Sequence, residues 1–201
     1  MLTARIDGLV LTRMYISKEN LQEFERLYGR PEELFTSFQM NPREYQNLLD
    51  SQKHNRSHDV TIFIRKDDKW VVNAKPWYPE GLYRIPSGGI RPDESLAAGA
   101  QREAFEETGS RIDILRYFLR IFVRFYSDNR SVDWVSHLIL TDWKAGELRP
   151  VDTVEIKKVH LAERSEFERF GRIMLKLDVG GLHYREYLHR QAFKILDALD
   201  D

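Results

Sequence analysis

Cysteine is absent from the 201-residue sequence, and long apolar runs are absent as well. Without cysteine there can be no disulfide framework, no thiol nucleophile and no zinc site built on thiolates. No run approaches the ~20 apolar residues that a membrane span needs, so no membrane partner is expected. Residues 1–7 carry charges within their short apolar stretch and make a poor signal peptide. These features favour a soluble protein of the cytoplasm.

Neither sign of charge dominates the chain. Its 31 basic and 32 acidic residues are mixed along the sequence and give a formal net charge of −1. This balance offers no basic surface for coating a nucleic acid, so no nucleic-acid partner is expected. Hydrophobic residues make up 42% of the sequence, which is enough to build the core of one domain with some extra elements.

Residues 1–57 are predicted to form a helical N-terminal extension. Ser17 can cap a first helix over residues 18–28, and Gly29 can end it. A second short helix is expected from Pro31, and it would bury Leu34, Phe35 and Phe38. A third helix begins with a capping-box pattern and ends near residue 50; the pattern is formed by Asn41, Pro42 and Glu44.

Residues 58–175 are predicted to form the main domain, because their apolar pattern changes to the alternation of strands. Strands are expected near residues 60–64, 70–72, 82–85, 114–126, 132–143 and 155–161. A helix capped by Asp93 is expected over residues 94–108, and Gly109 is its left-handed stop. Further helices are expected over 163–173 and 182–199, the latter within a C-terminal segment of residues 176–201. The pattern predicts a mixed sheet with helices packed on it.

Three glutamates of the predicted helix over 94–108 lie at positions i, i+3 and i+4, namely Glu103, Glu106 and Glu107. This spacing places three carboxylates on one helix face, where they repel one another at neutral pH. A hard divalent cation with oxygen ligands removes that repulsion. For three acids alone, a solvated helix face is the more common explanation. Gly88-Gly89 precede the helix and allow the backbone a close approach to a ligand.

The glutamates belong to a longer pattern that resembles the Nudix box, G-x5-E-x7-R-E-U-x-E-E-x-G-U, in which U is a bulky aliphatic residue. The residues in register are Gly88, Glu94, Arg102, Glu103, Glu106, Glu107 and Gly109. Ala104 and Ser110 depart from two U positions, and Ile112 can supply the missing apolar contact. The resemblance implies an α+β fold, the Nudix α/β/α sandwich with a mixed sheet, to which this chain adds the N-terminal extension and the C-terminal helix.

The resemblance also implies a metal site and a reaction. Nudix hydrolases cleave nucleoside diphosphates linked to another moiety, such as sugar nucleotides or dinucleoside polyphosphates. The implied cofactor is Mg²⁺, with Mn²⁺ as an alternative, and its implied ligands are Gly88, Glu103, Glu106 and Glu107. Arg102 is expected to orient these carboxylates. The base that takes the proton from water is expected to be Glu106, Glu107 or, from a later loop, Glu155.

Candidate substrate-binding residues lie outside the box. The expected strand over 114–126 alternates basic and aromatic side chains on one face, which could bind phosphates and stack on a ring. The candidates are Arg84, Arg120, Arg124 and Tyr126. The same face of the strand could instead be a subunit interface, or could be covered by the N-terminal helices.

The sequence leaves two further possibilities open, one for the function and one for the assembly. One is a Nudix domain that binds a nucleotide without cleaving it, although such modules usually lose box carboxylates and this chain keeps them all. The other is a homodimer built through the N-terminal helices or the C-terminal helix, which is compatible with catalysis on a small nucleotide substrate.

Overall fold

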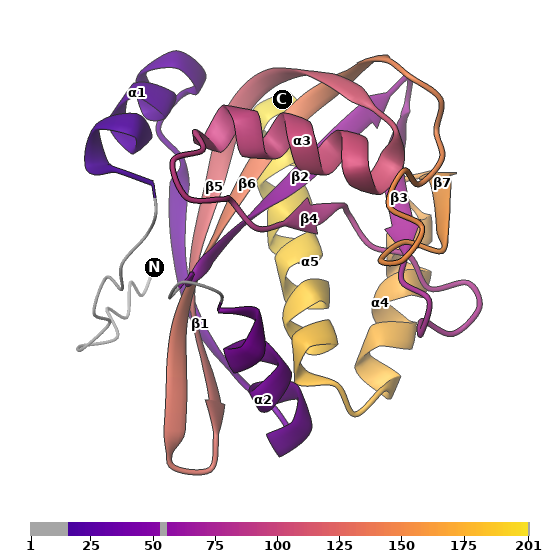
Figure 1. The fold of residues 1–201 in the computed structure, drawn as a ribbon. Helices are drawn as coiled ribbons and strands as arrows, with labels where there is room; N and C mark the ends of the chain where they lie inside the picture. The colour runs from indigo at the N-terminus through magenta and orange to yellow at the C-terminus, as the bar shows by residue number, and fades with distance from the viewer. Residues whose placement is uncertain (1–15, 53–55, 201) are drawn as a thin grey trace.

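The computed structural model describes residues 16–52 and 56–200 as five helices around one sheet (Figure 1). The prediction that residues 1–7 make a poor signal peptide concerns residues outside the described part of the chain. The elements are α1 Lys18–Tyr28, β1 Glu32–Gln39, α2 Pro42–Ser51, β2 His58–Lys66, β3 Lys69–Ala74, β4 Ser87–Gly88, α3 Leu96–Thr108, β5 Arg111–Ser127, β6 Arg130–Ala145, β7 Lys158–Ala162, α4 Glu166–Lys176 and α5 Gly180–Asp200.

The sheet is mixed, as predicted. Its strands follow the order β1-β5-β6-β2-β3-β7, and the short β4 pairs with β2. The β1–β5 and β2–β6 pairs are parallel, while β5–β6, β2–β3, β2–β4 and β3–β7 are antiparallel. Both faces of such a sheet need cover, because its central strands carry apolar residues on each side.

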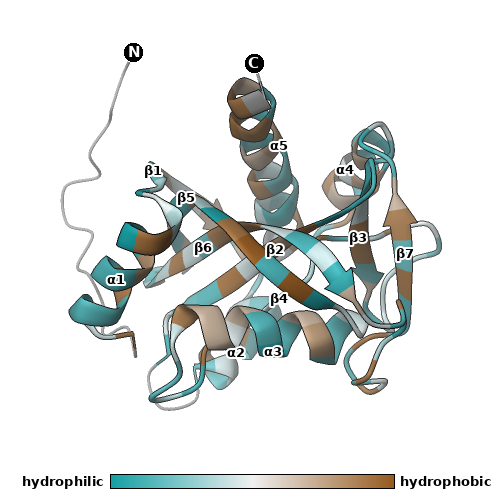
Figure 2. Cartoon of the chain, turned by 90° about the horizontal axis from the view of Figure 1, so that it is seen from above, coloured by the Kyte–Doolittle hydropathy of each residue, from teal (hydrophilic) through white to brown (hydrophobic). Residues whose placement is uncertain are grey.

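Helices cover both faces of the sheet. On one face, α1 and α3 pack over Val60, Ile62 and Ile64 of β2. On the other face, α4 and α5 pack over Phe63 and the apolar residues of β5, and α2 adds Tyr45 to the same core. Figure 2 shows α3 and α5 on opposite sides of the sheet. This is the predicted α/β/α sandwich.

The segment from Arg84 to Gly88 lies in a gap between β2 and β3. The two strands pair directly only next to their turn, at residues 65–66 and 69–70. Farther along, the Asn73 and Arg84 backbones exchange two hydrogen bonds of 2.8 and 2.9 Å, and Ile62 N donates to Pro86 O. Ser87–Gly88 then pair with β2 as β4. The sequence predicted a separate strand over 82–85; the structure instead has this insertion, which holds Gly88 beside α3.

The capping predictions for α1 and α2 are confirmed. The Ser17 side chain accepts a hydrogen bond from Asn20 N at the start of α1, and Gly29 follows its last residue. At α2 both halves of the capping box form, since Asn41 and Glu44 each accept from the other's backbone N–H. These local side-chain bonds satisfy N–H groups that a helix start leaves free.

The prediction of a helix that starts at Pro31 is wrong, because residues 32–39 form strand β1. This strand pairs in parallel with β5 along its whole length. The ring of Phe35 stacks on Phe122 at 4.8 Å, and Leu34 and Phe38 pack against the core. Backbone pairing with β5 outweighs the local helix preference of this stretch, which becomes an edge strand of the sheet. The N-terminal extension is therefore part of the sheet and not purely helical.

The start of α3 also differs from the expectation. Ser95, not Asp93, caps the helix and accepts a hydrogen bond from Ala98 N. Asp93 has a φ of 63°, in the left-handed region, so it lies in the turn before the helix and cannot act as an N-cap with extended backbone. Gly109, with a φ of 70°, ends α3 as predicted.

Two strand predictions need smaller corrections. β7 begins at Lys158, so Glu155 lies in a turn before it. In β5, a register shift between Tyr117 and Leu119 interrupts the simple alternation. Phe118 and Phe122, aromatic residues predicted to lie on the same face of this strand as Arg120 and Arg124, are buried.

Among the described helices, none is long and apolar enough to cross a membrane.

Buried histidines make the stability of the fold dependent on pH. His58 is fully buried in β2, and burial lowers its pKa to about 4. His137 and His189 are buried too, and burial lowers their pKa values well below the usual range.

We therefore predict a loss of stability below pH ~6.5, where the histidines of the unfolded chain bind protons that the folded protein does not. For His58 alone the folded state should lose about 2 kcal/mol between pH 7.5 and pH 5. Urea unfolding at the two pH values measures this change in the free energy of unfolding. A stability that is flat over this window would contradict the buried, neutral state of these rings.

Candidate active site

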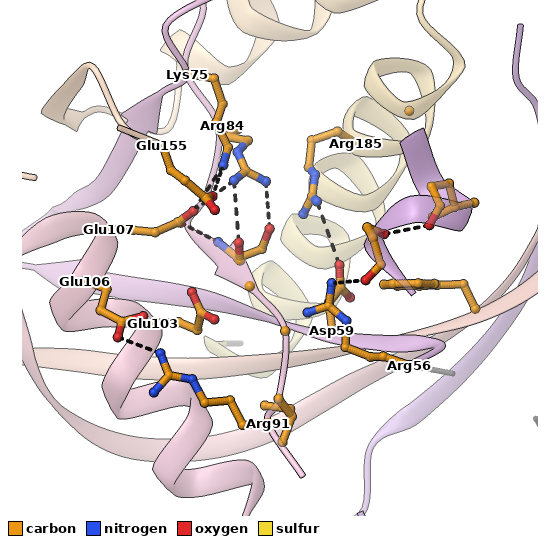
Figure 3. A pocket seen from close by; sticks show the side chains of 18 of the residues that line it. Arg56, Asp59, Lys75, Arg84, Arg91, Glu103, Glu106, Glu107, Glu155 and Arg185 are labelled. Atoms are coloured by element: carbon orange, nitrogen blue, oxygen red, sulfur yellow. Dashed lines mark hydrogen bonds and ion pairs between the residues drawn. The ribbon is translucent and has the colours of Figure 1, made fainter. Parts of the chain in front are cut away.

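An open cavity of about 870 Å³ lies where α3 and the inserted segment face α2 and α5. Charged side chains of both signs line it, six basic and six acidic: Arg56, Lys75, Arg84, Arg91, Arg102, Arg185, Asp59, Glu103, Glu106, Glu107, Asp152 and Glu155. Figure 3 shows most of them converging on the cavity from opposite walls. A cavity of this size and charge suits a polar molecule rather than an apolar one.

Arg102 gathers the carboxylates of α3 toward the glycine loop. Its Nε and Nη2 each donate to Glu94 at 2.8 Å, and its Nη1 donates to Glu103 at 2.8 Å and to Glu106 at 2.9 Å. Nη2 also donates to the Gly89 carbonyl at 2.7 Å. Because guanidinium N–H groups have fixed directions, these bonds constrain the carboxylate positions.

Gly88 leaves room for the carboxylate of Glu103. A Cβ atom added at Gly88 would lie 1.9 Å from the carboxyl carbon of Glu103, so any side chain there would displace it. Burial raises the pKa of Glu103, Arg102 opposes this, and the neighbouring Glu107 and Glu106 raise the pKa further. The site therefore disfavours the charged form of Glu103, mainly because the carboxylate is buried.

Glu107 forms the floor of the cavity and is only 3% exposed. Its carboxylate accepts hydrogen bonds from Asn73 Nδ2 at 2.7 Å, Ser87 N at 2.8 Å and Arg84 Nη2 at 3.1 Å. Arg84 is itself 6% exposed and also donates to Ser87 Oγ. Burial lowers the pKa of Arg84, but Glu107 and other acids raise it by more. The pair is therefore a buried ion pair whose hydrogen bonds are largely satisfied.

A family model of the NUDIX domain matches residues 55–177, well over half of the chain. This chain belongs to the NUDIX family. The matched region contains the cavity walls from β2, β4 and α3, while α1, β1, α2 and α5 lie outside it.

Curated NUDIX relatives share about a quarter of the aligned residues. The NAD-capped RNA hydrolase NudC of Photobacterium profundum is 26% identical over 121 residues, which are 60% of this chain and 43% of that protein. The protein of the same name from Vibrio parahaemolyticus is 28% identical over 91 residues, covering 45% of this chain and 33% of that one. The chain thus aligns with less than half the length of these relatives.

Solved NUDIX structures are similar at low identity. A NUDIX-family hydrolase of Clostridium perfringens is 17% identical with a TM-score of 0.49, and the match covers 72% of this chain and 99% of that one. A NUDIX hydrolase from Nitrosomonas europaea is 18% identical with a TM-score of 0.46, covering 58% and 78% of the two chains.

The loop that carries Glu155 is tied to the end of α3. Val151 N and Asp152 N both donate to the Glu106 carbonyl, and Asp152 Oδ1 accepts from Val154 N and Glu155 N. The Glu155 carboxylate accepts from Lys75 Nζ at 2.7 Å, and Lys75 Nζ lies 3.8 Å from Glu107. Glu155 is thus held at the cavity mouth beside the NUDIX carboxylates.

The donor atoms at α3 fit a hard divalent cation, the kind of metal that NUDIX hydrolases generally use. They are all oxygens, from three carboxylates and the Gly88 backbone, and Gly88 leaves room for the carboxylate of Glu103. In the described part of the chain, no three acidic or histidine side chains are already arranged to hold a metal ion. Glu103 and Glu106 instead share the guanidinium group of Arg102.

Of the four predicted substrate contacts, only Arg84 lines the cavity. Arg120 bonds to Glu25, Glu33 and the Tyr117 hydroxyl, so this part of β5 is covered by α1. Arg124 binds Asp133 through two hydrogen bonds.

Tyr126 lies near the far end of β5, beside β1 and outside the cavity lining. The geometry therefore gives no support to substrate contact by Arg120, Arg124 or Tyr126. It matches the alternative in which the N-terminal elements cover this strand.

Sequence reasoning missed Asn73, which holds Glu107, and the cavity residues Lys75, Arg91 and Arg185. Asn73 and Lys75 lie in and just after an ordinary apolar strand, and no spacing links them to the box. Arg91 binds Glu106 at 3.1 Å from the loop before α3, where its position three residues after Gly88 was the only available signal. Arg185 comes from α5, far along the chain.

We predict that Glu107→Ala destabilises the fold by about 3–5 kcal/mol, because it leaves the Arg84 charge buried without a partner. Glu107→Gln retains an acceptor for Ser87 N and Asn73 and should cost clearly less. Urea unfolding of both variants and the wild type measures the difference. An alanine variant as stable as the wild type would contradict the buried ion pair between Arg84 and Glu107.

Proposed function

We propose that this protein is a Mg²⁺-dependent hydrolase that cleaves the diphosphate linkage of a nucleoside diphosphate derivative. One observation carries the proposal: Arg102 holds Glu94, Glu103, Glu106 and the Gly89 carbonyl together at the wall of a charged cavity. A bound divalent cation would supply charge neutralisation at the diphosphate and would activate water. Gly88, Glu103, Glu106 and Glu107 would hold it.

The basic side chains around the carboxylates would bind the phosphates. Lys75, Arg84 and Arg91 line the cavity on the same side as Glu106 and Glu107. Each is already oriented by an acidic partner, so little ordering is needed when a phosphate binds. Their charges would stabilise the negative charge that develops on the phosphate oxygens during hydrolysis.

Glu155 is the proposed base that takes the proton from the attacking water. Its side chain is 62% exposed at the cavity mouth, which leaves one face open to water. Lys75 holds it beside Glu107, and the turn at Asp152 fixes its backbone. Glu106 is the alternative base, but it is engaged by Arg91 and Arg102.

The substrate is proposed to be a small nucleotide derivative. The NudC relatives are named for NAD-capped RNA, and NAD contains the diphosphate linkage between two nucleosides that this site would accept. We therefore include NAD and an NAD-capped RNA with ADP-ribose, diadenosine polyphosphates and nucleoside triphosphates in a substrate panel. The metal is Mg²⁺, with Mn²⁺ as an alternative.

We predict that the purified protein releases phosphate-containing products from at least one panel member when Mg²⁺ is present, and that EDTA abolishes the release. Glu107→Gln and Glu155→Gln should each lower kcat by about a hundredfold or more. Glu168→Gln, on the exposed side of α4, is the matched control and should retain wild-type turnover. Product formation is followed by phosphorus NMR or by chromatography.

Two results would overturn the proposal. Wild-type turnover by folded Glu107→Gln would remove the assigned role of the box. Tight binding of a panel member with no turnover under any divalent metal would instead identify a nucleotide-binding module.

A further inference from the structure

The wall of the cavity opposite the NUDIX carboxylates is built by α2 and α5, which lie outside the matched family region. Glu44 of α2 accepts hydrogen bonds from Gly180 N and Gly181 N, so it ties the start of α5 to α2. One turn farther along α5, Arg185 extends from this fixed helix into the cavity (Figure 3). Its position is therefore set by a rigid element and not by a loop.

Arg185 has fewer partners than a buried guanidinium needs. Its side chain is only 12% exposed. Within the described residues its polar contacts are a hydrogen bond to Thr61 Oγ1 at 3.2 Å and an ion pair with Asp59 at the long distance of 4.0 Å. A guanidinium carries five N–H donors, so the rest of its hydrogen-bonding capacity is directed at the cavity.

Arg84 adds to this shortage of negative charge. Burial lowers the pKa of Arg185, and the nearby Arg84 lowers it further, while Asp59 only partly compensates. Arg84 binds Glu107 at 3.1 Å and so belongs to the side of the cavity that carries the NUDIX carboxylates. Arg185 belongs to the opposite wall, on α5, and both arginines line the cavity. Arg84 has a close carboxylate partner in Glu107, whereas the carboxylate that faces Arg185, Asp59, is 4.0 Å away. Two neighbouring cations of which only one is closely paired favour an additional anion.

We propose that Arg185 binds a phosphoryl group of the substrate, next to Arg84, and thereby selects compounds with a phosphate beyond the linkage that is cleaved. This rests on the proposed function for the reaction, but the anion site is a separate claim. The chemistry of the site matches a polyphosphate chain, or a nucleotide with a further phosphate. Apolar side chains that also line the cavity, Met40, Leu48, Phe125 and Trp134, would contact the organic moiety attached to it.

The competing explanation is that Arg185 only braces β2 against α5 through Thr61 and Asp59. The two explanations differ in the effect of Asp59. If Arg185 binds an anion, Asp59 competes with that anion, and Asp59→Asn should strengthen anion binding. If Arg185 is only a brace, removing the charge of Asp59 weakens the same brace as Arg185→Gln does, and anion binding gains nothing.

The test uses inorganic tripolyphosphate as the probe, titrated calorimetrically into the full chain with EDTA present, so that neither metal nor turnover enters. We expect Arg185→Gln to raise the Kd about tenfold or more, Arg185→Lys to raise it less, and Asp59→Asn to lower it. Arg190→Gln is the matched control, because Arg190 is exposed on the same helix and does not line the cavity. It should leave the Kd unchanged. Thermal unfolding verifies that each variant is folded.

Unchanged tripolyphosphate binding by Arg185→Gln or, should that variant not fold, by Arg185→Lys would overturn the proposal. So would weaker binding by Asp59→Asn, or an equal loss in Arg190→Gln. The outcome is independent of the hydrolase assignment. Loss of binding in the Arg185 variants without turnover of any panel compound keeps the anion site and removes the proposed reaction. Turnover of a panel compound, with Kd and KM values that do not change in the Arg185 variants, keeps the proposed reaction and removes the anion site.

Discussion

The buried carboxylate of Glu107 joins α3 to strand β3 and to the inserted segment that follows it. It accepts hydrogen bonds from Asn73 of β3, from Arg84 in the inserted segment and from the backbone of Ser87 in β4. These bonds hold the inserted segment between β2 and β3 and keep Gly88 against α3. Since burying an unpaired charge is costly, each partner depends on the others, and the position of the glycine loop depends on all of them.

The same elements explain how the fold produces a site. Arg102 draws the carboxylates of α3 toward the Gly89 carbonyl, and the Val151–Asp152 backbone at the end of α3 brings Glu155 to the cavity mouth. Like charges that would repel on an isolated helix are thus kept close by the guanidinium group. A cation and a diphosphate would replace the repulsion by attraction, which is why the arrangement suits hydrolysis of a phosphoanhydride.

Much of the fold and part of the site could be predicted from local patterns. The capping box of Asn41 and Glu44, the glycine stop at Gly109 and the spacing of the box residues each act over a few residues, so the sequence shows them directly. The strand β1 could not be predicted, because its pairing partner lies about 87 residues away in β5. Arg185 was equally hidden, since only the packing of α5 brings it to the cavity. The basic residues of β5 were misleading because α1 and Asp133, not a ligand, bind them.

The central claim is that Gly88 and the α3 glutamates hold a divalent cation against a diphosphate. The most direct measurement is a crystal structure of the protein with Mn²⁺ and a non-hydrolysable diphosphate nucleotide, with the ion located by its anomalous scattering. The account predicts an anomalous peak among Glu103, Glu106, Glu107 and the Gly88 carbonyl, with the diphosphate oxygens in contact with the same ion. A nucleotide seated in the cavity with no ion at these carboxylates, or an ion bound elsewhere, would contradict it.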